Sequence, residues 1–190
     1  MSKTITLKDV QLRYASLVTP YVPEQGAPKY TMQFYLTPDS KELKAIEDGL
    51  EEAARETWPK DYKAKLIKAK NGLGSYSLIP PEKNTDELAE GRTAVKATAF
   101  ADRPLPLFDG DGLPTTNPAL FYAGAFVNVQ LRFNAYQPRA DGAPPQVKLD
   151  IVGVRFSKHG EKIGGKRPSI TADDLEALGV KLDVSGDDLI

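Results

Sequence analysis

Strict alternation of apolar and polar residues over positions 126–136 is the feature that most constrains how this chain can fold. Side chains of a β-strand alternate between its two faces. One row is entirely apolar and predicts a buried face: Val127, Val129, Leu131, Phe133 and Ala135. The opposite row holds amides, one guanidinium and a ring at each end: Phe126, Asn128, Gln130, Arg132, Asn134 and Tyr136. Amides hydrogen-bond to base edges, arginine contacts phosphate and aromatic rings stack on bases. The second row favours a nucleic-acid-facing strand, with a solvated strand face as the alternative.

Four other stretches also have the alternation of strands, namely residues 5–14, 29–36, 93–101 and 146–156. The apolar parity of the first changes near Asp9, which predicts a bulge or bend there. The parity of the last changes at Gly153, and a bulge at this glycine places Arg155 on the outer face.

A helix is predicted to begin at residues 37–40, because Pro38 suits a first turn and apolar residues then recur at helical spacing up to Trp58. Five lysines follow within residues 60–70 and are opposed only by Asp61. We interpret this run as a solvated face, although it would also suit a phosphate backbone.

These elements predict an α+β, mainly β fold: a five-stranded antiparallel barrel of the oligonucleotide-binding (OB) type with one main helix and long loops. Residues 1–170 are expected to form this domain, with a helical insertion at about 38–70. Residues 171–190 are expected to form a short C-terminal helix and an acidic, partly disordered tail, because six of the 26 acids but only one of the 25 bases fall there.

Composition argues against most enzyme classes. The chain has no cysteine, which removes disulfides and thiolate sites and fits a reducing, cytoplasmic setting. His159 is the only histidine, so zinc sites and histidine-based dyads lack their parts. Residues 160–167 nearly match a phosphate loop, but Arg167 stands where a hydroxyl is needed. We expect no catalytic residue, cofactor or metal, and a metal-dependent nuclease remains a minor alternative.

No apolar run approaches the ~18 residues that a membrane span needs, and no signal peptide is expected. The predicted polar rows of three strands each combine a ring with a base or an amide. Together with neighbouring cations they form the predicted nucleic-acid-binding set: Tyr35, Lys96, Phe100, Arg103, Phe126, Asn128, Gln130, Arg132, Tyr136, Lys148, Arg155, Lys158 and Lys162. The main helix carries acids on its outer side, which disfavours a groove-reading helix and makes single strands the expected ligand.

The chain resembles the single-stranded DNA-binding proteins of tailed bacteriophages, including a family once catalogued only as phage proteins of unknown function. The resemblance is carried by residues 29–36 (KYTMQFYL), 121–124 (FYAG), 126–136 and 152–156 (VGVRF), and it spans most of residues 5–160. It implies an OB fold, no catalysis, and coating of exposed strands in replication, recombination or repair in the host cytoplasm.

The C-terminus is similar to the acidic tails of such proteins, which recruit replication enzymes and compete with DNA. The expected partner-binding residues are Asp183, Asp187, Asp188, Leu189 and Ile190. Leu189 and Ile190 replace the usual aromatic ending, so the partner stays open, and a solvated end is the alternative. A non-enzymatic protein-interaction or virion-assembly module using the same aromatic face is the second functional hypothesis, and the oligomeric state is open between monomer and homodimer.

Overall fold

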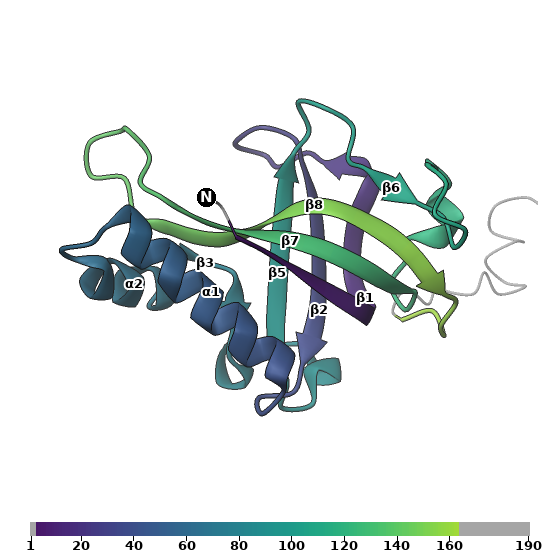
Figure 1. Ribbon diagram of the computed structural model, residues 1–190, viewed down its shortest axis with the longest axis horizontal. Helices are drawn as coiled ribbons and strands as arrows, with labels where there is room; N and C mark the ends of the chain where they lie inside the picture. Colours follow the sequence, from purple (N-terminus) through teal and green to yellow (C-terminus); the bar gives the residue numbers. More distant parts are fainter. Residues whose placement is uncertain (1–2, 164–190) are drawn as a thin grey trace, which may run out of the picture.

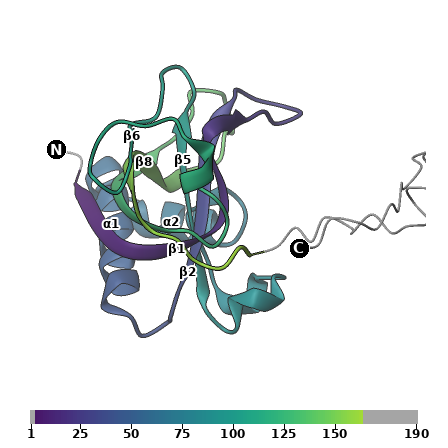
Figure 2. The ribbon, with the colours of Figure 1, turned by 90° about the vertical axis from the view of Figure 1, so that its right-hand side faces the viewer.

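The computed structural model describes residues 3–163, and five long strands form its centre. They are β1 (Thr4–Tyr21), β2 (Lys29–Leu36), β5 (Thr93–Phe100), β7 (Phe126–Tyr136) and β8 (Gln146–Lys158). All five strands expected from the alternation are therefore present. β1 is longer than expected and curves around the barrel as one continuous arc (Figure 2).

The strands follow one another around the barrel in the order β8, β7, β1, β2, β5, and each of these neighbouring pairs is antiparallel. The ring closes where β5 pairs with β8 in parallel, with Ala97 opposite Leu149 and Thr98 opposite Asp150. The predicted OB-type barrel is confirmed, but the expectation that it is wholly antiparallel is wrong. A closed ring with an odd number of strands cannot alternate direction at every pair, so at least one pair must be parallel.

Both predicted changes of parity are bulges. In β1 the register with β7 shifts between Leu7 and Val10, where Asp9 takes a φ of 52°. In β8, Gly153 pairs with Gln130 and Ile151 with Leu131, which leaves one extra residue between them. Each bulge keeps the apolar row of its strand buried on both sides of the break.

Two helices lie between β2 and β5 in the sequence: α1 (Lys41–Thr57) and α2 (Tyr62–Lys70). Ser40 caps α1 by accepting a hydrogen bond from the Leu43 amide at 3.2 Å. The buried stripe of α1, which includes Ile46 and Leu50, packs against the inner side of β7. Both helices lie beside the end of the β7–β8 hairpin that carries its turn (Figure 1). The core is continuous from the barrel into this helical layer.

Short elements complete the described chain: β3 (Ser75–Tyr76), β4 (Leu78–Ile79), β6 (Leu107–Phe108), and the 3₁₀ turns η1 (Pro81–Lys83), η2 (Glu87–Ala89) and η3 (Pro118–Leu120). β3 and β6 add in parallel to β8, and β4 adds antiparallel to β5. Neither α1 nor α2 is long and apolar enough to cross a membrane. The expected C-terminal helix and acidic tail lie outside the described residues.

Candidate nucleic-acid interface

A groove of about 310 Å³ opens on the outer face of the barrel, at the seam where β5 meets β8. Only two residue pairs join these strands, so the groove lies where their outward side chains spread apart. We call it the seam groove. The cations and acids in its lining, together with its one large exposed ring, are Lys29, Phe100, Asp102, Arg103, Arg132, Lys148 and Asp150.

Strand register explains why residues distant in sequence meet here. Paired residues of neighbouring strands point to the same face. Lys29 of β2 lies opposite Phe100 of β5, and Arg132 of β7 lies opposite Asp150 of β8. The loop after β5 supplies Arg103. Of the predicted binding residues, Phe100, Arg103, Arg132 and Lys148 are thus brought together in one groove.

Cations outnumber acids in the seam groove: four lysines and arginines face two aspartates. Asp150 accepts hydrogen bonds from Arg132 Nη2 at 3.2 Å and from Asn134 Nδ2 at 3.0 Å. The Arg132 side chain nevertheless keeps 45% of its surface exposed. The groove therefore has a net positive charge and fixes one guanidinium without covering it.

Lys148 lies between two aromatic rings. Its ammonium nitrogen is 5.3 Å from the centroid of Phe100 and 5.2 Å from that of Tyr136, within cation–π range. Phe100 is 63% exposed, so much of its ring is accessible to a ligand. Ring, cation and ring in a row can stack bases and neutralise a phosphate within one short span.

A second group of predicted residues lies at the opposite end of the β7–β8 hairpin. Lys158 is 4.9 Å above the Phe126 ring, and Lys162 is 5.9 Å from the ring of Tyr122. Here Arg155 donates to the Gly110 carbonyl at 2.7 Å, and the Asn128 side chain accepts from the Asp9 amide at 2.9 Å. These last two side chains are engaged by the chain's own backbone.

Gln130 and Lys96 are exposed and lie apart from both groups. Gln130 is on β7 between the two ends of the hairpin, and Lys96 pairs with Gln33 of β2. Sequence reasoning missed Lys29, which pairs with Phe100, and Tyr21, the next residue in the same cross-strand row. Lys29 has the outward parity of β2 and could have been found from it. Tyr21, which pairs with Lys29 and is 51% exposed, lies on the part of β1 beyond the predicted strand 5–14.

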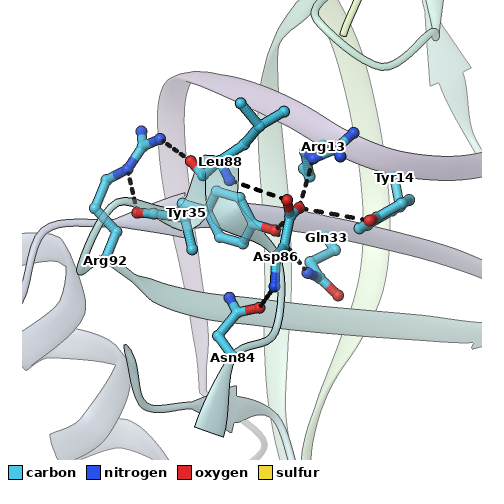
Figure 3. A network of polar contacts seen from close by, with 9 residues as sticks. Arg13, Tyr14, Gln33, Tyr35, Asn84, Asp86, Leu88 and Arg92 are labelled. Carbon is cyan, nitrogen blue, oxygen red and sulfur yellow. Dashed lines mark hydrogen bonds and ion pairs between the residues drawn. The ribbon is translucent and has the colours of Figure 1, made fainter. Parts of the chain in front are cut away.

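Tyr35 belongs to a separate cluster on the outer face, which we call the Asp86 network (Figure 3). It consists of Arg13, Tyr14, Gln33, Tyr35, Asn84 and Asp86. Arg13 Nε lies 2.7 Å from Asp86 Oδ2, and the Tyr35 hydroxyl donates to the same oxygen. These two hydrogen bonds lower the pKa of Asp86 to about 2. Burial, with the Asp86 contact second, raises the pKa of Tyr35.

A closed OB-type barrel with cations and exposed rings on its outer face defines an OB-fold protein suited to extended nucleic acid. The chain belongs to the family described as "Enterobacter phage Enc34, ssDNA-binding protein", whose family model matches residues 3–185. This assignment confirms the family resemblance of the sequence.

Solved structures of phage proteins have the same fold. The single-stranded DNA-binding protein from bacteriophage Enc34, in complex with ssDNA, superposes with a TM-score of 0.67 at 17% identity, covering 85% of this chain and 89% of that chain. The single-stranded DNA-binding protein gp2.5 of bacteriophage T7 gives a TM-score of 0.60 at 16% identity, covering 100% of both chains. No curated protein matches the sequence.

Proposed function

We propose that this chain is a sequence-tolerant, non-enzymatic single-stranded DNA-binding protein that acts in phage DNA replication, recombination or repair in the host cytoplasm. Its family membership supports the ligand. The observation that carries the proposed site is the Lys148 ammonium held between the exposed Phe100 ring and Tyr136, inside a groove lined by three further cations.

In the seam groove, aromatic rings contact the bases and cations contact the phosphates of the DNA. Unpaired bases stack on Phe100 and Tyr136, each contributing about 1–3 kcal/mol, and the stacking tolerates any sequence because every base has a π-face. Lys29, Arg103 and Lys148 neutralise the phosphates, and Asp150 orients Arg132 beside them. A duplex keeps its bases stacked on one another, so the rings gain nothing from it.

Fluorescence anisotropy with an oligothymidine, the matching duplex and an RNA of the same length tests this proposal across a salt series. We expect tight binding of the single strand. For each phosphate contact, the logarithm of the affinity should fall by about 0.7 for every tenfold rise in salt concentration. Lys148→Ala should weaken binding about tenfold, because it removes a phosphate contact and the cation between the two rings.

The matched control is Lys44→Ala, an exposed lysine of α1 that pairs with Asp48 at 3.3 Å on the helical layer. It removes the same charge and should leave affinity nearly unchanged. Absence of single-strand binding at low salt would contradict the proposal and favour the protein-interaction module. Equal losses in both variants would show that net charge, and not the seam groove, sets the affinity.

We propose further that the acidic segment at residues 183–190 competes with DNA for the cationic face and recruits a replication protein. The charge asymmetry of the sequence supports this. Deleting these residues should tighten binding most at low salt, where competition between opposite charges is strongest. Unchanged affinity after the deletion would remove the competition and leave the seam groove untouched.

A further inference from the structure

Two of the four lysines of α2, Lys65 and Lys68, line a second and larger groove. It has a volume of about 630 Å³ and lies between the C-terminal half of α2 and the turn that joins β7 to β8. We call it the helix groove. Its polar side chains are Lys65, Lys68, Gln137 and Gln146, and no acidic residue of the described chain lines it.

The walls of the helix groove are fixed to each other by backbone contacts. α2 ends in a left-handed Gly72 (φ 81°), and the Leu73 amide bonds back to the Lys68 carbonyl at 3.0 Å. A Cβ on Gly74 would lie 2.3 Å from the Pro145 carbonyl oxygen, so only glycine lets the two segments approach so closely. The Ser75 amide then bonds to the same oxygen at 3.1 Å.

The cations of the helix groove are also positioned. Lys65 Nζ donates to Gln137 Oε1 at 2.6 Å and lies 5.5 Å from the centroid of the Trp58 ring. Lys65 Nζ also lies 3.7 Å from Asp61 Oδ2, and the Lys65 side chain is 22% exposed, so its ammonium is held at the border of the groove. Lys68, three residues further along the same helix face, is exposed.

The helix groove continues the seam groove along β8. Gln146 lines the helix groove and Lys148 lines the seam groove, and both belong to the same outward row of β8. Two residues of a strand span about 6.6 Å. Tyr136, whose ring contacts Lys148, lies directly opposite Gln146. A DNA strand that extends from Phe100 and Tyr136 into the helix groove therefore meets amide side chains first and lysines next.

We propose that the helix groove binds the sugar-phosphate backbone of the same DNA strand that occupies the seam groove, so that α2 lengthens the binding site beyond the barrel. This rests on the proposed function. The lining favours phosphate over base because it offers ammonium and amide donors but no aromatic ring. The outer side of α1, with Glu47, Asp48 and Glu51, repels a polyanion and bounds the path on that side.

The test compares oligothymidines of about 6 and about 16 nucleotides, which span the site sizes of a single OB fold. Lys68→Ala should weaken binding of the longer strand about fivefold at 0.1 M salt and make its salt slope shallower by about 0.7, because one phosphate contact is lost. The shorter strand, which the seam groove holds by itself, should bind as before. Lys63→Ala is the control, since Lys63 is an exposed lysine of the same helix outside the groove.

Equal losses for Lys63→Ala and Lys68→Ala, equal losses for both strand lengths, or no loss for the longer strand would each overturn the inference. If Lys148→Ala nevertheless binds single strands more weakly than the wild-type protein does, the proposed function stands and only the helix groove loses its role. If the wild-type chain binds neither strand, both proposals fail. Capture of an acidic peptide that depends on Lys68, with unchanged binding of the longer strand, would assign the groove to a protein partner instead.

Discussion

The seam groove and the Asp86 network both lie on the outside of the barrel and contain the same kinds of side chain, but they differ in how exposed these side chains are. Each pairs an arginine with an aspartate next to tyrosine and an amide. In the network the Arg13 side chain is only 13% exposed, whereas Arg132 in the groove is 45% exposed. One arginine is sealed into the protein, and the other stays open to a ligand.

The loop that precedes β5 causes this difference. This loop carries Asp86. Asp86 Oδ1 accepts a hydrogen bond from the Leu88 amide at 3.1 Å, which caps the turn of the loop, and Oδ2 accepts hydrogen bonds from Arg13 and Tyr35. Asp150 instead projects from β8; its own side chain is only 16% exposed, but the Arg132 side chain that it binds stays 45% exposed. Two arginines that are each paired with an aspartate thus differ in how far the rest of the chain covers them.

Replacing Asp86 should give the largest effect on stability. Asp86→Ala removes the acceptor of Arg13 and Tyr35 and leaves a largely buried guanidinium unpaired, which should cost about 3 kcal/mol of unfolding free energy. Chemical denaturation measures this loss. Asp48→Ala, which breaks an exposed pair with Lys44, is the control and should cost under about 0.5 kcal/mol. If Asp86→Ala weakened DNA binding without loss of stability, the network would belong to the binding site.

Acid should remove part of the same stabilisation in the wild-type protein. The pKa of Asp86 is lowered to about 2 in the folded state, against about 3.9 when unfolded. A depressed folded pKa stabilises the fold above the unfolded pKa, and this contribution of roughly 2 kcal/mol is lost as the pH falls from about 4 to about 2. Denaturation curves at several pH values should show the drop, and Asp86→Asn should flatten it. The same pH dependence in both proteins would mean that other carboxylates are responsible.

The sequence was sufficient for the elements whose pattern is local. Alternation predicted the five long strands, and breaks in parity located the bulges near Asp9 and Gly153, because a one-residue slip exposes a whole apolar row. The family followed from the order of these strands. The parallel closure of β5 on β8 needed a further step, since direction within a closed ring is a property of all five strands together.

The site was only partly predictable. Phe100, Arg132 and Lys148, which line the seam groove, were predicted from outward parity combined with an unusual residue type. Asp86 was not found, because nothing in residues 80–92 indicates that this loop folds onto β1 and β2. The same contact decides that Tyr35 lies in a hydrogen-bond network and not in the groove. Contacts between a loop and a distant strand depend on tertiary packing, which residue patterns do not record.

Phe100→Ala should affect DNA binding and leave stability nearly unchanged, which distinguishes the seam groove from the Asp86 network. Loss of one stacking plane should lower the affinity for an oligothymidine about tenfold, equivalent to about 1.4 kcal/mol. Because the ring is 63% exposed, the unfolding free energy should change little, the reverse of Asp86→Ala. Anisotropy and denaturation on the same preparation measure both quantities. Phe100→Trp should retain affinity, and an equal loss with tryptophan would show that the ring packs in the protein and does not stack on bases.

The smallest expected effect is that of replacing Asp150. It tests how far the seam groove differs from the Asp86 network. Asp150→Asn removes a negative charge from the seam groove but keeps an oxygen that can accept from Asn134 and Arg132. We expect DNA affinity to rise about two- to threefold at low salt, because phosphate no longer competes with a carboxylate for the Arg132 guanidinium. The unfolding free energy should fall by under about 1 kcal/mol, because Arg132 is exposed enough to be solvated. Anisotropy across a salt series measures the gain, which should shrink as salt screens the charges. A loss of affinity instead would mean that Asp150 holds Arg132 as firmly as Asp86 holds Arg13, and that the groove also depends on a carboxylate anchor.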